Sequence, residues 1–137
     1  MLLEIDYHNG MPIYRQVIEQ IRHQIMAGQL IEGQQLVSVR ELATRLTVNP
    51  MTISKAYTLL EAEGLVERRR GVGLFVARLP KGHKIQTQTT ILEEILKQAV
   101  VAAVQFGISE EQIRAMLMRL YKKYNSKTRE ERDRTNE

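Results

Sequence analysis

The segment SVRELATRLTVNPMTISKAYTLLEAEG, residues 38–64, contains the start signals of two short helices that follow each other closely. Ser38 and Glu41 form a capping box, in which the serine oxygen caps the first turn and the glutamate reaches back. Asn49 before Pro50 is the second signal, an N-cap residue followed by proline at the first helical position. Two short helices joined by so tight a turn predict a helix-turn-helix.

The residues on either side of this segment extend the pattern. Apolar residues at helical spacing predict a helix over residues 12–27, with Pro12 at its start. After Gly64 the spacing changes to two short β-prone runs, 65–66 and 74–76, with glycines between them. Such runs predict a hairpin. The expected fold class is therefore mainly α with a small β-hairpin, a winged helix-turn-helix followed by further helices.

Length and composition exclude several classes of protein. The chain has 137 residues, 43% of them hydrophobic and 26% charged, which suits a small globular domain with an appendage. Its longest apolar run, residues 99–104, is far shorter than the roughly 20 residues of a membrane helix. We therefore expect a cytoplasmic protein with no membrane partner. The chain has no cysteine and three scattered histidines, so we expect no catalytic residue, no metal and no cofactor.

The positive charge is concentrated in the middle of the chain. Residues 38–84 carry nine basic and four acidic side chains, a net charge of +5, whereas the whole chain carries +4. A basic segment that coincides with a helix-turn-helix and a hairpin is typical of a protein that binds a polyanion. The alternative is a basic, solvated surface without a partner.

The chain after the hairpin predicts further regions. In chain order we expect a winged domain over residues 1–80, a linker over 81–88, two helices over 89–124 and a disordered tail over 125–137. The linker has no apolar period, and the tail has no apolar residue. Capping boxes at Thr90 with Glu93 and at Ser109 with Gln112 are expected to open the two helices.

The two predicted helices indicate self-association. Each has about 15 residues and a wide apolar face, and a pair of that size is too small to close a core alone. Paired across a twofold axis, the helices of two copies would form a small bundle. We therefore expect a homodimer through residues 89–124. The alternative is that these helices fold back on residues 17–25 of the same chain.

Several motifs resemble the DNA-binding domain of GntR-family bacterial transcription regulators. They are PIY at 12–14, SxRELA at 38–43, VNPxTIxKAY at 48–57, LExxGL at 60–65 and RGxGxFV at 70–76. Val37 departs from the family pattern, which has proline before this serine. The short extension is similar to that of the small YtrA-type subfamily, in which it serves dimerisation. The resemblance implies a dimeric repressor near a transporter operon, and it identifies no small-molecule effector.

The resemblance and the chemistry of DNA grooves together give candidate contacts to a double-stranded DNA operator. In such folds the second helix of the helix-turn-helix enters the major groove. Arginines of a wing suit phosphates and a narrow minor groove, and glycine lets the backbone approach closely. The candidate DNA-binding residues are Ser38, Arg40, Asn49, Met51, Thr52, Ser54, Lys55, Arg68, Arg69, Arg70 and Gly71.

Some of these residues have an alternative role. Asn49 could serve only as a helix cap. Arg40 could form a surface ion pair with Glu41 or Glu61 in place of a DNA contact. Strand alternation predicts that Arg68 and Arg70 share a face. A dimer with two reading helices predicts an inverted-repeat operator with half-sites about one helical turn apart. The alternative function is a winged-helix protein-interaction module without specific DNA binding.

Overall fold

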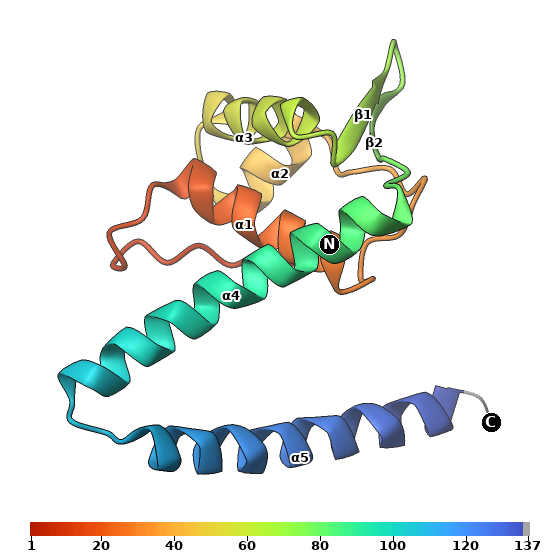
Figure 1. The fold of residues 1–137 in the computed structure, drawn as a ribbon. Coiled ribbons are helices and arrows are strands. Elements are labelled where there is room, and N and C mark those ends of the chain that lie inside the picture. The colour runs from red at the N-terminus through yellow and green to blue at the C-terminus, as the bar shows by residue number, and fades with distance from the viewer. Residues whose placement is uncertain (136–137) are drawn as a thin grey trace. The chain divides into compact units, whose positions relative to one another are not determined.

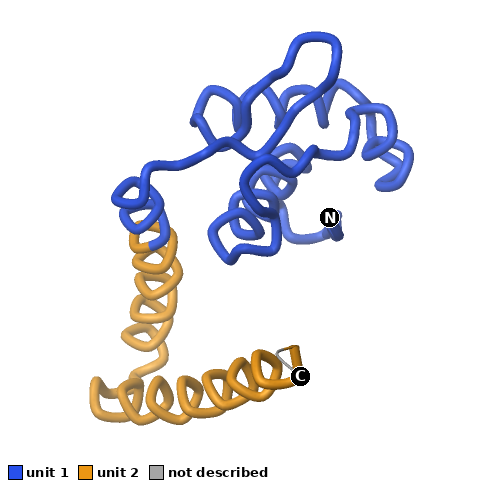
Figure 2. The backbone as a smooth tube through the Cα atoms, turned by 90° about the vertical axis from the view of Figure 1, so that its right-hand side faces the viewer, with its two compact units in different colours: residues 1–88 blue, residues 89–137 orange. Residues whose placement is uncertain are grey.

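The structure, a computed structural model, describes residues 1–135, and its backbone packs as two units (Figure 2). One unit is Met1–Gln88 and the other is Thr89–Glu137. The described residues form α1 (Ile13–Met26), α2 (Val39–Leu46), α3 (Pro50–Ala62), β1 (Val66–Arg69), β2 (Gly73–Val76), α4 (Lys81–Gln105) and α5 (Glu110–Thr135) (Figure 1). The predicted fold class, mainly helical with one small antiparallel hairpin, is confirmed.

The core of the first unit lies where α3 packs against both α1 and α2. Helix α1 follows Pro12 and contributes Val17 and Ile21, both fully buried. Helix α3 contributes Ile53 and Leu60, which are also fully buried. Burying a side chain of this kind contributes roughly 1.5–3 kcal/mol. These contacts hold the two helices of the helix-turn-helix in one orientation.

Both predicted helix starts of the helix-turn-helix form. The Ser38 Oγ accepts a hydrogen bond from the Glu41 amide at 3.2 Å, and the Asn49 Oδ1 accepts one from the Met51 amide at 2.9 Å. The other half of the predicted Ser38 capping box does not form. The Glu41 carboxylate pairs instead with Arg45, one turn further along, at 2.6 Å. An ionised partner at i,i+4 makes a stronger bond than the serine amide offers.

A third, short backbone segment pairs with the hairpin of β1 and β2. Its register pairs Val66 with Val76 and Arg69 with Gly73. The backbone before α2 adds to β2 through an isolated bridge between Gln35 and Phe75. The Leu36 amide donates to the Leu74 carbonyl at 2.8 Å, and the Val76 amide donates to the Gln34 carbonyl at 2.8 Å. The hairpin is thereby attached to the segment that leads into α2.

The predicted linker and tail are wrong for the residues that the structure describes. Residues 81–88 form the first turns of α4, where the Lys84 amide donates to the Pro80 carbonyl at 3.0 Å. Thr90 accordingly lies inside α4 rather than at a helix start. Residues 125–135 continue α5. Lys and Gln make up half of residues 81–88, and Lys, Arg and Glu make up about half of residues 125–135; these side chains favour helix without any apolar face. Residues 136 and 137, the end of the predicted tail, lie outside the described residues.

The second unit exposes most of its apolar residues. Among residues 89–135 only Ala103 is buried. Helix α5 is opened by the predicted reciprocal capping box, in which Ser109 and Gln112 exchange bonds of 2.9 and 3.2 Å. The large exposed apolar side chains of this unit are Leu92, Ile95, Leu96, Val100, Val101, Val104, Phe106, Met116, Leu117, Met118, Leu120, Tyr121 and Tyr124. None of the helices within residues 1–135 combines the length and apolar character needed to span a membrane.

Candidate nucleic-acid interface

The first turn of α3 presents a short set of accessible side chains. Met51 is 78% exposed, Ser54 is exposed and Thr52 is half-buried. The Asn49 oxygen is occupied as the cap of α3. Hydroxyl groups beside an exposed methionine offer both hydrogen bonds and apolar contact, which are the two ways a helix distinguishes bases in a major groove. Met51 and Ser54 are therefore exposed together at the start of the helix, with Thr52 half-buried between them.

Lys55 is attached to the first helix of the chain. Its Nζ lies 3.9 Å from the centre of the Tyr14 ring, so a residue of α3 is held by the first turn of α1. A cation over an aromatic face is stabilised by the ring quadrupole. The ammonium is therefore oriented before any partner is present. This contact was not predicted, because apolar spacing identifies the buried face of each helix but not which helices pack against each other.

Arg40 extends from the first turn of α2 without a partner in the described residues. Its two predicted ion-pair partners are both occupied by other arginines. Glu41 pairs with Arg45 at 2.6 Å, and Glu61 pairs with Arg68 at 3.1 Å. The guanidinium of Arg40 keeps all its donors available to an external acceptor.

The three wing arginines differ in their surroundings. Arg68 is neutralised by Glu61 at 3.1 Å. Arg69 lies with its guanidinium 4.0 Å from the centre of the Phe75 ring and 3.5 Å from Glu67. Arg70 has no ion pair in the described part of the chain. Only the third arginine carries an unshared charge.

The predicted alternation of Arg68 and Arg70 does not apply. Strand β1 ends at Arg69, and Arg70 lies in the turn that follows. The Val72 amide closes this turn by donating to the Arg69 carbonyl at 3.0 Å, and Gly71 in its third place has a φ of 76°. A positive φ at that place favours glycine. Arg70 therefore sits at the tip of the hairpin, which extends beyond the layer of α3 (Figure 1).

Tyr57 fixes the approach to α2. The side chain is 2% exposed, and its hydroxyl donates to the Val37 carbonyl at 2.7 Å. Burial raises the pKa of the Tyr57 phenol, Arg45 lowers it and Glu41 raises it further. The hydroxyl therefore remains a hydrogen-bond donor well above neutral pH, and it holds the residue before Ser38 in place.

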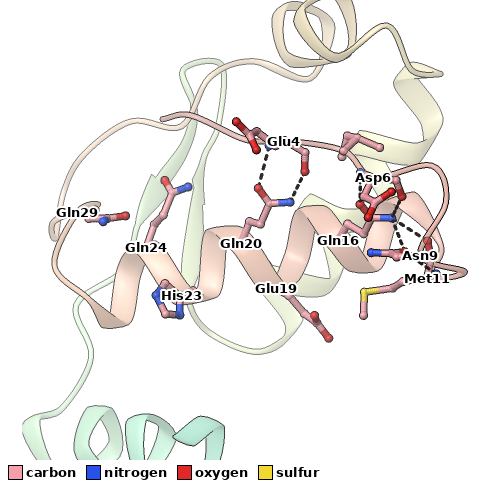
Figure 3. Close-up of a pocket in the computed structure, with 11 residues that line it drawn as sticks. Glu4, Asp6, Asn9, Met11, Gln16, Glu19, Gln20, His23, Gln24 and Gln29 are labelled. Atoms are coloured by element: carbon pink, nitrogen blue, oxygen red, sulfur yellow. Dashed lines mark hydrogen bonds between the residues drawn. The ribbon is translucent and has the colours of Figure 1, made fainter. Parts of the chain in front are cut away.

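A polar groove of about 770 Å³ lies beside α1, between this helix and the N-terminal segment (Figure 3). Gln16, Gln20 and Gln24 project from successive turns of α1. Gln20 exchanges hydrogen bonds of 2.9 and 2.6 Å with the Glu4 backbone, and Gln16 exchanges bonds of 2.9 and 2.8 Å with that of Asp6. The amides are thus occupied in fastening the N-terminal segment. In residues 1–135 no group of three acidic, histidine or cysteine side chains is placed to hold a metal.

Comparison with known proteins matches this arrangement to one family. Residues 13–76 match the family of bacterial regulatory proteins named gntR. The HTH-type transcriptional repressor YtrA of Bacillus subtilis is 38% identical over 112 residues, 82% of this chain and 86% of YtrA. The chain belongs to the GntR family. The resemblance predicted from the sequence is therefore confirmed, and the match to YtrA extends beyond the winged domain of this GntR protein.

Solved structures agree with the assignment. A GntR family transcriptional regulator from Listeria monocytogenes is 33% identical, with a TM-score of 0.72 over 82% of this chain and 98% of that one. AraR(DBD), solved in complex with operator ORX1, is 32% identical, with a TM-score of 0.51 over 56% of this chain and 99% of that one. YtrA and the Listeria protein are named as regulators of transcription, and none of the three relatives is named as an enzyme.

Proposed function

We propose that this GntR protein is a dimeric repressor that binds an inverted-repeat DNA operator near a transporter operon. The observation that carries the proposal is the distribution of free side chains on the winged domain. Arg40 and Arg70 form no ion pair within residues 1–135, and Met51 and Ser54 are exposed at the start of α3. These residues belong to a segment of net charge +5. Similarity to the repressor YtrA supports the direction of regulation.

The free side chains suit three parts of a DNA duplex. The start of α3 enters the major groove, where Thr52 and Ser54 donate to base edges and Met51 contacts thymine methyl groups. Arg40, on the preceding helix, contacts a base or the phosphate beside it. Arg70 at the hairpin tip neutralises a phosphate or enters the minor groove, and Gly71 brings the backbone close. Lys55 and Arg68 contribute charge to phosphate binding.

The second unit is assigned to dimerisation. Its apolar side chains are exposed in the single chain, with only Ala103 buried among residues 89–135. Patches of this extent on a soluble protein mark association surfaces. We place the homodimer interface in residues 89–124, where these side chains lie. A twofold axis there would present two α3 helices to the two halves of an operator.

A titration with DNA tests the proposal. Labelled upstream DNA of the protein's own gene is titrated in parallel with a shuffled fragment of equal length and composition, at fixed salt. Binding of the upstream fragment at least about 1,000-fold tighter than the shuffled one is expected. Equal binding of both fragments contradicts specific recognition. Absence of binding to either favours the alternative, a winged-helix module that contacts another protein.

A further inference from the structure

The side chain of Gln35 reaches the turn of the wing. Its Nε2 donates to the Val72 carbonyl at 3.0 Å, although the two residues are far apart in the sequence. Val72 lies in the turn that carries Arg70 and Gly71. The backbone of Gln35 forms the isolated bridge with Phe75 in β2, the strand that follows this turn. One residue thus contacts the wing through both its backbone and its side chain.

Gly73 leaves the space that the Gln35 amide occupies. A Cβ at Gly73 would lie 2.9 Å from the Gln35 Nε2, closer than side-chain carbons approach such atoms. The φ of Gly73 is 139°, a conformation that other residues rarely adopt. The glycine therefore has two reasons to be there, its backbone conformation and the close approach of the glutamine. The amide and the glycine form a matched pair beside the tip.

The wing has little else to hold its tip. Each strand has four residues, and an isolated two-stranded hairpin is marginally stable in water. The base of the hairpin is anchored, because Leu36 is buried and its amide donates to the Leu74 carbonyl at 2.8 Å. Beyond the base, the turn itself receives one side-chain hydrogen bond from the described residues, and Gln35 donates it. It links the tip to the backbone that leads into α2.

We propose that Gln35 is a positioning residue for the wing, which holds the turn so that Arg70 meets the same DNA as α3. The proposal rests on the proposed DNA-binding function. A charged tip that is already oriented loses less conformational freedom when it binds. Without the bond, the turn samples several orientations, and the contact of Arg70 with a phosphate costs more. Gln35 itself touches no DNA in this scheme.

The test is a double-mutant cycle on the intact protein. Gln35→Met keeps the length of the side chain and removes the donor, and Arg70→Ala removes the charge at the tip. We expect Gln35→Met to weaken operator binding about 3- to 10-fold, the size of one lost hydrogen bond. In the Arg70→Ala background the same substitution should change binding less than about twofold. Gln29→Met is the matched control, because Gln29 is exposed in the same unit and its side chain forms no hydrogen bond with any described residue.

A second variant and a second measurement separate positioning from stability. Gly73→Ala displaces the amide and also strains the backbone at a φ of 139°, so it should weaken operator binding at least as much as Gln35→Met. The thermal midpoint of Gln35→Met should stay within about 2 °C of the parent, because the bond is exposed and local. The proposal is overturned if Gln35→Met lowers the thermal midpoint strongly and its effect on operator binding is the same with and without Arg70.

The remaining outcomes distinguish the two hypotheses. If Arg70→Ala weakens binding and Gln35→Met does not, DNA binding stands and the positioning role of Gln35 is wrong. If the two effects simply add, Gln35 acts elsewhere than through the tip, and the proposal is again wrong. If the parent protein does not bind the upstream fragment, the proposed function fails and the inference fails with it.

Discussion

The Lys55 ammonium lies 3.9 Å from the centre of the Tyr14 ring, which ties α3 to α1, the first helix of the chain. We expect Tyr14→Leu to weaken binding to all DNA sequences about 2- to 5-fold, because an exposed cation–π contact contributes about 0.5–1 kcal/mol. Tyr14→Phe keeps the ring and should bind as the parent does. Fluorescence anisotropy with operator and shuffled DNA measures both. Equal losses in the two variants would assign the effect to the hydroxyl group instead.

The wing arginines should contribute unequally to phosphate binding. Arg70 has no ion pair to any residue that the structure describes, whereas Arg68 is paired with Glu61 at 3.1 Å. We expect Arg70→Ala to weaken operator and shuffled DNA alike and to lower the salt slope by about one unit per half-site. Arg68→Ala should have the smaller effect, because the charge it removes is already partly neutralised.

Releasing Arg68 from its partner supplies the reverse test. Glu61→Gln leaves the guanidinium unpaired and should strengthen binding to shuffled DNA and increase the salt slope. Titrations at several salt concentrations measure these slopes. Equal losses for Arg68→Ala and Arg70→Ala, with no gain in Glu61→Gln, would mean that the Arg68–Glu61 pair does not persist in the complex.

Sequence discrimination should depend on Arg40 and Thr52. Each alanine substitution is expected to reduce the ratio of operator to shuffled-DNA affinity by roughly 1–3 kcal/mol, the value of a good base contact. Arg45→Ala is the matched control, since this arginine lies on the same helix α2 and its charge is paired with Glu41 at 2.6 Å. An unchanged affinity ratio in both test variants would place the base readout outside these residues.

Tyr57 predicts a loss of stability in alkali. Burial raises the pKa of its phenol in the folded state, whereas the unfolded chain keeps a value of about 10. The unfolded state therefore ionises first, so the stabilisation is complete below about pH 10 and falls as the pH rises above it. Urea unfolding at pH 8 and at pH 10.5 should show a larger loss for the parent than for Tyr57→Phe.

Tyr57→Phe should also be less stable than the parent at neutral pH. Tyr57→Phe removes the donor to the Val37 carbonyl, bonded at 2.7 Å, and should lower the free energy of unfolding by about 0.5–1.5 kcal/mol. If the parent and Tyr57→Phe lose stability equally in alkali, groups other than Tyr57 account for the pH dependence, and the role given to Tyr57 is wrong.

Local signals explain which parts of the fold were predictable from the sequence. Ser38 and Asn49 cap helices through bonds to amides two or three residues away, so the sequence alone locates α2 and α3. The glycines between the two β-prone runs likewise indicate the turn of the hairpin from neighbouring residues alone. Residues 81–88 were misassigned because the absence of an apolar period was interpreted as absence of helix. Backbone bonds and helix-favouring side chains are enough to continue α4 there.

The sequence names the candidate DNA-contacting residues but does not show which of them form ion pairs with each other's neighbours. Arg40, Arg68 and Arg70 were all proposed from the sequence, yet only the packed structure shows that Glu61 pairs with Arg68 and that Arg40 has no ion pair among the described residues. Contacts of this kind join residues from different elements, and their distances depend on how those elements pack. Gln35 was missed altogether for the same reason, since nothing near it in the sequence indicates the wing.

The apolar faces of the second unit should hold two copies together. Leu96 in α4 and Leu117 in α5 are 41% and 52% exposed in the single chain. We expect sedimentation of the parent at micromolar concentration to give twice the chain mass of 15.9 kDa. Leu96→Asp and Leu117→Asp should each give the single-chain mass, because a carboxylate in an apolar interface is costly to desolvate. Gln98→Asp, which places a carboxylate two residues from Leu96 and so on the opposite side of α4, should remain dimeric.

Dissociation should also change DNA binding in a defined way. A dimer binds its second half-site at a high effective concentration, so the Leu96→Asp protein is expected to bind the operator about 100-fold more weakly or worse. Its affinity for a single half-site should equal that of the parent, since the winged domain is unaltered. A parent protein that sediments at the single-chain mass would exclude the dimer. A Leu96→Asp protein that stays dimeric would place the interface away from this face of α4.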